Sequence, residues 1–185
     1  QCYSNVSRVF LEKVNGVYQG AAIMFREGFK SGCVPLRLDP DGVMIYGGTA
    51  RGWGSRGGQD FSLERVTWSG DVPFEIHEMR ARPDGFEFTF TQPADVQSLS
   101  DPAHWKTQAW TYIYQADYGS PEVDACEPKI NAIEVAADGR SARVRVDKVT
   151  KGHVHHFALP GVRSTTGESL LHESAYYTLN EIPAE

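Results

Sequence analysis

The chain has 185 residues, and its 24 acidic and 18 basic side chains give a formal net charge of −6. The two signs are interspersed, and the sequence has no basic stripe of the kind that binds nucleic acid. No apolar run reaches the length of a membrane-spanning helix. With 41% hydrophobic residues, the chain is expected to form one large or two small globular domains.

Short alternating stretches rich in Val, Ile, Phe, Tyr and Thr predict strands in the first seventy residues. Residues 8–14 alternate and end at Asn15-Gly16, a strong signal for a tight hairpin, beyond which 18–25 continue the pattern. Further strands are expected at 36–38, 43–46 and 61–68. The sequence therefore predicts successive antiparallel hairpins in this region.

We interpret residues 1–70 as a partial antiparallel sheet, about one and a half blades of a β-propeller. A long glycine-rich loop ending at Gly58 lies between two of its strands. A blade buries its faces only against neighbouring blades. This segment should therefore pack on the rest of the chain or on a partner.

After a boundary at 68–73 the pattern changes, and residues 71–185 predict an immunoglobulin-like β-sandwich. The expected strands are 74–79, 86–90, 105–114, 130–135, 142–146, 154–159 and 176–179. A short helix or turn is expected at 99–106, and a polar excursion at 117–128. About seven strands in about 110 residues is the number expected of such a sandwich. The fold class is therefore all-β.

Several segments carry resemblances to known families. Those that resemble a bacterial Ig-like domain are 86–95, 136–146, 151–156 and 161–167. The chain also resembles the C-terminal region of large secreted bacterial sorbosone/glucose-dehydrogenase-like β-propeller proteins, which are often fused to a c-type cytochrome. The segments that carry this second likeness are 8–16, 49–55, 118–124 and 175–180. The resemblance implies a secreted or periplasmic protein whose partner is the remaining propeller. No residue here matches that family's quinone ligands, catalytic His or haem-attachment motif.

Three histidines form a candidate metal site. Because side chains alternate along a strand, His153 and His155 should share one face, and His172 follows about one hairpin later. Imidazoles that converge on a stiff strand are suitable ligands for copper or zinc. The alternative is a hydrogen-bonded structural pair, since the spacing fixes no third ligand.

An aromatic group forms a second candidate site. Its members, with two nearby carboxylates, are Trp105, Trp110, Tyr112, Tyr114, Tyr118, Asp117 and Glu122. Aromatic faces stack on sugar rings while carboxylates bind the hydroxyl groups. The alternative, favoured for most of these residues, is the core of the sandwich.

The glycine-rich loop is a third candidate site. Arg51, Trp53 and Arg56 lie among its glycines and could hold an anion or a sugar. It lacks the residues of a phosphate loop, and a long strand crossing anchored by Trp53 explains it equally well.

The three cysteines fit neither a zinc spacing nor a disulfide-dense scaffold. They are Cys2, Cys33 and Cys126. Either Cys2 and Cys33 form a bridge, or all three are partly buried thiols.

We interpret the chain as a non-catalytic accessory or binding module of a secreted carbohydrate-acting protein. The candidate sugar-binding residues are Arg51, Trp53, Arg56, Trp105, Tyr118 and Glu122. One alternative is the C-terminal part of a quinone- or haem-dependent sugar dehydrogenase. The other is an Ig-like domain that binds copper or zinc through His153, His155 and His172.

Overall fold

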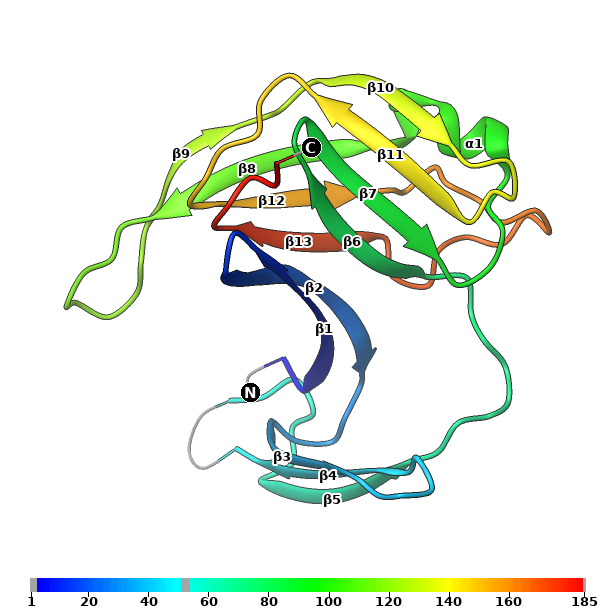
Figure 1. Ribbon diagram of the computed structural model, residues 1–185. Helices are drawn as coiled ribbons and strands as arrows, with labels where there is room; N and C mark the ends of the chain where they lie inside the picture. The colour runs from blue at the N-terminus through cyan, green and yellow to red at the C-terminus, as the bar shows by residue number, and fades with distance from the viewer. Residues whose placement is uncertain (1–2, 51–53, 185) are drawn as a thin grey trace. The chain divides into compact units, whose positions relative to one another are not determined.

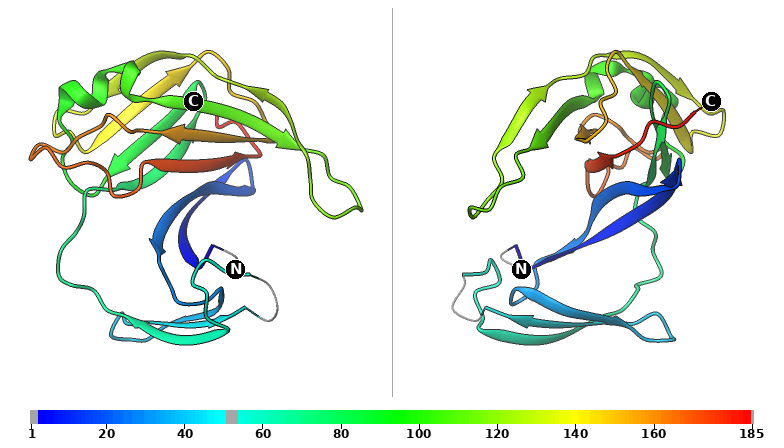
Figure 2. Two further views of the ribbon diagram at one scale, coloured as in Figure 1. Left: turned by 180° about the vertical axis from the view of Figure 1, so that it is seen from behind. Right: turned by 60° about the vertical axis from the view of Figure 1, so that its left-hand side comes forward.

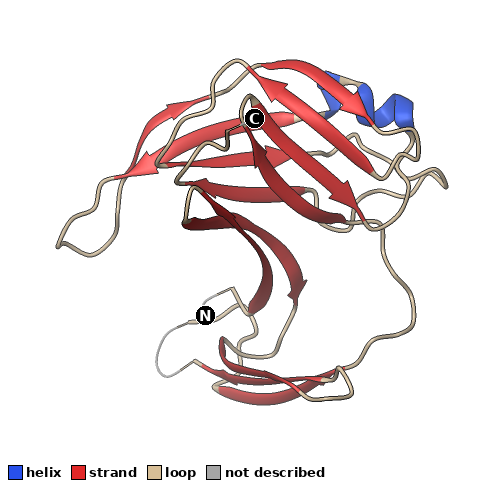
Figure 3. Cartoon of the chain, in the orientation of Figure 1, coloured by secondary structure: helices blue, strands red, loops and turns tan. Residues whose placement is uncertain are grey.

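The computed structural model describes residues 3–50 and 54–184, and Figure 1 shows its elements in chain order. Strands dominate these residues, and the helical elements are short (Figure 3). The all-β prediction is therefore confirmed. The chain divides into two compact units, one of residues 1–8 and 24–71 and the other of residues 9–23 and 72–185.

The first unit contains a three-stranded antiparallel sheet. Its strands, in sheet order, are β3 (Cys33–Leu38), β4 (Met44–Thr49) and β5 (Phe61–Val66). The rings of Phe29 and Tyr46 stack beneath it with their centres 4.0 Å apart, and Met44 completes this small core. The Tyr46 hydroxyl donates a 2.7 Å hydrogen bond to the Ser31 carbonyl. The buried phenol is thus paired, as a buried polar group must be.

The first hairpin joins β1 (Asn5–Val14) to β2 (Val17–Glu27), as its turn sequence predicts. Asn15 and Gly16 have φ values of 48° and 83°. Positive φ at both central residues is the requirement of the tight turn whose twist matches that of the flanking strands. Gly20 is also required, because an added Cβ would lie 1.9 Å from the Phe10 carbonyl oxygen.

This hairpin does not extend the three-stranded sheet of the first unit. Instead, β2 pairs in antiparallel fashion with β13 (Ser174–Leu179), near the end of the chain. Residues 9–23 consequently belong to the second unit, whereas the sequence suggested consecutive domains at 1–70 and 71–185. A partner strand so far along the chain leaves no mark on local periodicity. The propeller interpretation of the first segment stays a prediction.

The second unit is a sandwich of two antiparallel sheets. Its remaining strands are β6 (Ile76–Arg82), β7 (Gly85–Phe90), β8 (Lys106–Tyr112), β9 (Glu122–Cys126), β10 (Ile130–Val135), β11 (Ser141–Val146) and β12 (His153–Ala158). One sheet has the order β1-β2-β13-β12-β8-β9, and the other has the order β10-β11-β7-β6. The hairpin between β8 and β9 extends away from the sheets in both views of Figure 2.

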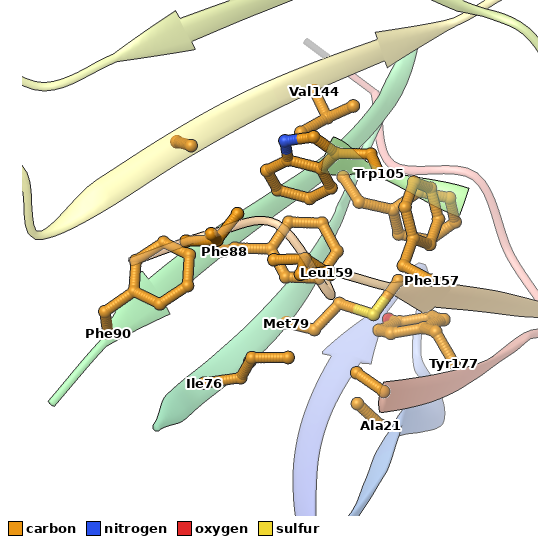
Figure 4. Packing of buried hydrophobic residues seen from close by; sticks show 14 of the residues in the cluster. Ala21, Ile76, Met79, Phe88, Phe90, Trp105, Val144, Phe157, Leu159 and Tyr177 are labelled. Carbon is orange, nitrogen blue, oxygen red and sulfur yellow. The ribbon is translucent and has the colours of Figure 1, made fainter. Parts of the chain in front are cut away.

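Aromatic side chains from both sheets fill the core of the sandwich (Figure 4). The ring of Phe86 on β7 lies 5.3 Å from the rings of Phe157 on β12 and Tyr177 on β13. Phe88 lies 5.3 Å from Phe157 as well. These rings meet at tilted or edge-on angles, which the aromatic quadrupole favours over face-to-face contact.

Several predicted boundaries in the second unit differ from the structure, and one strand was not predicted. The helix α1 spans Val96–Ser100 and so begins earlier than expected. Asp95 caps its N-terminus, because the Asp95 carboxylate accepts a 2.7 Å hydrogen bond from the Ser98 amide. A 3-10 turn follows at Pro102–His104. The polar stretch at 117–128 contains strand β9, which sequence alternation did not indicate.

Glu12 on β1 connects the hairpin to both sheets of the sandwich. Its Oε1 accepts a 2.7 Å hydrogen bond from the Ala81 amide on β6 and a second, short one from the Tyr177 hydroxyl on β13. The side chain of Glu12 is 12% exposed. Burial and the hydrogen bond to Glu12 both raise the pKa of Tyr177, so its phenol remains a donor at physiological pH.

We expect Glu12→Ala to lower the free energy of unfolding by about 2–4 kcal/mol, because it leaves two buried donors without an acceptor. Glu12→Gln keeps an acceptor oxygen and should cost less. Urea unfolding measures both, with Glu27→Ala, at an exposed carboxylate, as the control. A Glu12→Ala protein as stable as the control would contradict this role.

Candidate functional site

Three rings cluster on the outer face of the six-stranded sheet. The imidazole of His156 on β12 stacks on the ring of Tyr176 on β13, with centres 4.3 Å apart and planes 7° from parallel. Trp110 on β8 approaches both rings edge-on, at 6.3 and 6.4 Å. Tyr176 is 43% exposed. An aromatic surface therefore faces solvent on the side of the sheet opposite the core.

Strand register brings these rings together. His156 lies directly opposite Tyr176 on one neighbouring strand and opposite Gln108 on the other. Trp110 is two residues beyond Gln108 and so lies on the same face, one diagonal step from His156. Residues that are far apart in the sequence thus form one row across three strands.

The row lines the first of two adjoining hollows, which have volumes of about 460 and 450 Å³, and His156 alone of the three rings also lines the second. Both hollows are lined by Gln108, Glu127 and His156. The first is also lined by Ala109, Trp110, Glu122, Ala125, Cys126 and Tyr176. The second is also lined by Trp105, Lys106, Thr107 and Ala158. We call the two hollows together the outer groove.

Strand β9 and the residues after it form the wall of the outer groove. Glu122 lies opposite Tyr112 in the pairing of β8 with β9. Asp124 accepts a 3.0 Å hydrogen bond from Nε2 of the buried His153 on β12. The Thr107 hydroxyl donates to the Pro128 carbonyl at the other end of the wall. The wall is therefore attached to β12 as well as to β8.

His155 belongs to the core of the sandwich. Its ring lies 5.1 Å from Phe86, and its Nε2 accepts a 3.3 Å hydrogen bond from the Thr150 amide. Because Nε2 accepts, the neutral ring carries its proton on Nδ1, which is buried without a hydrogen-bond partner among the described residues. Burial, and secondarily the charge of His153, lower the pKa of His155 to about 4.

The structure does not assemble the predicted metal site. His153 and His155 share a face, as expected, but it is the buried face of β12. Both nitrogens of His153 face oxygen acceptors, and Nδ1 of His172 lies 2.6 Å from the buried carboxylate of Glu75. Within residues 3–50 and 54–184, no group of three or more His, Cys, Asp or Glu side chains could hold a metal ion.

The candidate sugar residues of the second unit have different locations. Trp105 lies in the core. Its Nε1 donates a 3.0 Å hydrogen bond to the Leu99 carbonyl, and its ring packs edge-on against Phe88. Only its margin lines the second hollow, so it offers no ring face to a sugar. Tyr118 is fully exposed in the β8–β9 loop, and Glu122 lines the first hollow.

The candidate residues of the first unit do not form a described site. The guanidinium of Arg56 lies over the ring of Tyr3, 4.8 Å from its centre. Arg51 and Trp53 lie outside the described residues, as does Cys2. Cys33 and Cys126 form no disulfide within the described parts of the chain.

The outer-groove residues that sequence reasoning missed include Gln108, Glu127, His156 and Tyr176. Alternation alone assigns His156 to the face opposite His155. It does not identify that face as outward, or β13 and β8 as the neighbouring strands. The missing signal is the strand order.

None of the described helices is long and apolar enough to cross a membrane. No protein-family model matches the chain, and no curated protein matches its sequence. Solved structures with some likeness include the surface layer protein SbsC, domains 1–6, at 16% identity and a TM-score of 0.45, and the crystal structure of S-layer protein rSbsC(31–844), at 18% and 0.46. Each match covers 62% of this chain and 15% of the other. These likenesses are too distant to bear on function.

We expect the free energy of unfolding to fall as the pH is lowered from about 6.5 to about 4. His155 alone should account for a decrease of about 3 kcal/mol. The pKa of this histidine is lowered by folding, so only the unfolded chain takes up the proton within this interval. The associated stability is complete above pH 6.5 and lost on acidification.

Urea unfolding at a series of pH values measures this loss. His155→Leu should flatten the pH profile even if it lowers stability at neutral pH. The exposed His77 provides the matched control, and His77→Gln should retain the full acid dependence. Equal slopes in His155→Leu and wild type would show that His155 is not the group responsible.

Proposed function

We propose that the second unit binds carbohydrate, as a non-catalytic module of a secreted carbohydrate-acting protein. The observation that carries this proposal is the outer groove, in which Trp110, His156 and Tyr176 adjoin exposed polar side chains. The C–H face of a sugar stacks on aromatic rings, and its hydroxyl groups need donors and acceptors at the edge of the platform.

The polar groups of the groove suit hydroxyl recognition. Glu122 and Glu127 supply carboxylate acceptors, and Gln108 supplies both a donor and an acceptor. All three residues are exposed, so their polar atoms are accessible to the hydroxyl groups of a sugar. Burial lowers the pKa of His156, so its ring is neutral at pH 7 and presents an uncharged surface.

The exposure of both carboxylates favours binding over hydrolysis. A glycosidase needs one carboxyl group kept protonated, usually by an apolar pocket, opposite a second that is ionised. Glu122 and Glu127 instead lie on one wall of an open groove. This arrangement supports a role in recognition.

We expect Trp110→Ala and Tyr176→Ala each to weaken polysaccharide binding about tenfold or more, or about 1.4 kcal/mol, by removing a stacking surface. Affinity electrophoresis through gels that contain neutral polysaccharides measures the change. Tyr18→Ala is the matched control, because Tyr18 is a 66% exposed tyrosine of the same unit outside the groove.

Circular dichroism and thermal unfolding establish that each variant remains folded. Retardation that is equal in Trp110→Ala, Tyr176→Ala and wild type would contradict the proposed site. Oxidation of a sugar by this 185-residue chain in a dye-coupled assay would contradict the non-catalytic assignment.

A further inference from the structure

The outer groove is elongated along β8. One hollow adjoins Trp105 to Gln108, and the other adjoins Gln108 to Trp110. At about 3.3 Å per residue, this part of the chain spans about 17 Å. The volume of each hollow is within the range of a small-molecule site of about 300–1,000 Å³. A single sugar ring would therefore leave one hollow empty.

The aromatic row also continues beyond the groove. Tyr112 lies two residues after Trp110, on the same face of β8, and is 46% exposed. Its neighbour in the β8–β9 pairing is Glu122, which lines the first hollow. A further exposed ring thus lies one step farther along the strand, beside a carboxylate of the first hollow.

The charges of the groove indicate which glycans it can accept. Glu122 and Glu127 make no ion pair within residues 3–50 and 54–184, and Lys106 is the one cation among the described lining residues. Glu127 lines both hollows, so a ligand in either one lies beside a carboxylate. A sugar acid would place like charges together, whereas a neutral or amino sugar would not.

We infer, on the basis of the proposed function, that the outer groove binds a linear glycan of two or more hexose units that carries no carboxylate groups. The chain lies along β8, with successive rings in the two hollows. Trp110, His156 and Tyr176 form the floor of one of these hollows, and Glu127 contributes to both. Glu122 and Glu127 disfavour the binding of uronic acids.

Isothermal titration calorimetry on the whole chain tests this inference. The probes are glucose, cellobiose, cellotetraose, mannotetraose, chitosan tetramer and tetragalacturonate. We expect at least one neutral or amino tetrasaccharide to bind about tenfold or more tightly than its monosaccharide, because it fills both hollows. Tetragalacturonate should bind about tenfold or more weakly than that tetrasaccharide.

A charge-neutralised variant isolates the role of the carboxylates. The double variant Glu122→Gln with Glu127→Gln keeps the shape of both side chains and removes their charge. It should reduce the ratio of the affinity for the best neutral tetrasaccharide to that for tetragalacturonate by about threefold or more. Glu168→Gln, at an exposed carboxylate outside the groove, should leave this ratio unchanged. All three substitutions replace exposed side chains, so the double variant and the control should both remain folded.

The outcomes separate this inference from the function on which it rests. If a tetrasaccharide binds no more tightly than its monosaccharide, the extended site is wrong and sugar binding stands. If tetragalacturonate binds as well as neutral tetrasaccharides, or the double variant does not reduce the affinity ratio, the charge selection is wrong. If no probe binds, the proposed function fails together with the inference.

Discussion

Opposite orientation of successive side chains on β8, β12 and β13 is the constraint on which both the core and the groove depend. On these strands Ala109, His155 and Tyr177 point into the sandwich, while Trp110, His156 and Tyr176 point outward. A slip of one residue in either pairing would exchange the two sets. Core packing therefore also fixes the geometry of the outer groove, because burial of one set holds the other in register.

The histidines illustrate how two adjacent residues acquire different roles. His155 is surrounded by core aromatics, and desolvation keeps its imidazole neutral. His156, on the opposite face, stacks on Tyr176 and donates to or accepts from the Ser174 hydroxyl at 3.1 Å. His153 is hydrogen-bonded to Asp124 and so helps to hold the groove wall. The three predicted metal ligands thus have separate roles: His155 lies in the core, His153 helps to hold the wall, and His172 lies beside Glu75.

Local sequence determined the strands and turns well, because alternation and Asn15-Gly16 act within a few residues. Strand order was not accessible in this way. The pairing of β2 with β13 joins segments more than 150 residues apart, and it transfers the first hairpin to the second unit. The same limitation affected the site: of the predicted sugar-binding candidates, Glu122 lines the groove, whereas the indole of Trp105 is held in the core by its hydrogen bond to Leu99.

The central claim is that a sugar stacks on the outer face of β8, β12 and β13. A two-dimensional ¹H–¹⁵N NMR titration with the tightest-binding oligosaccharide tests it directly, because the indole N–H groups of Trp105 and Trp110 report on the two faces of the sheet. The account predicts shifts for the Trp110 indole, the Gln108 side-chain amide and the β9 backbone, with the core Trp105 indole nearly unchanged. Shifts confined to residues outside this face, with Trp110 and Gln108 unmoved, would contradict it.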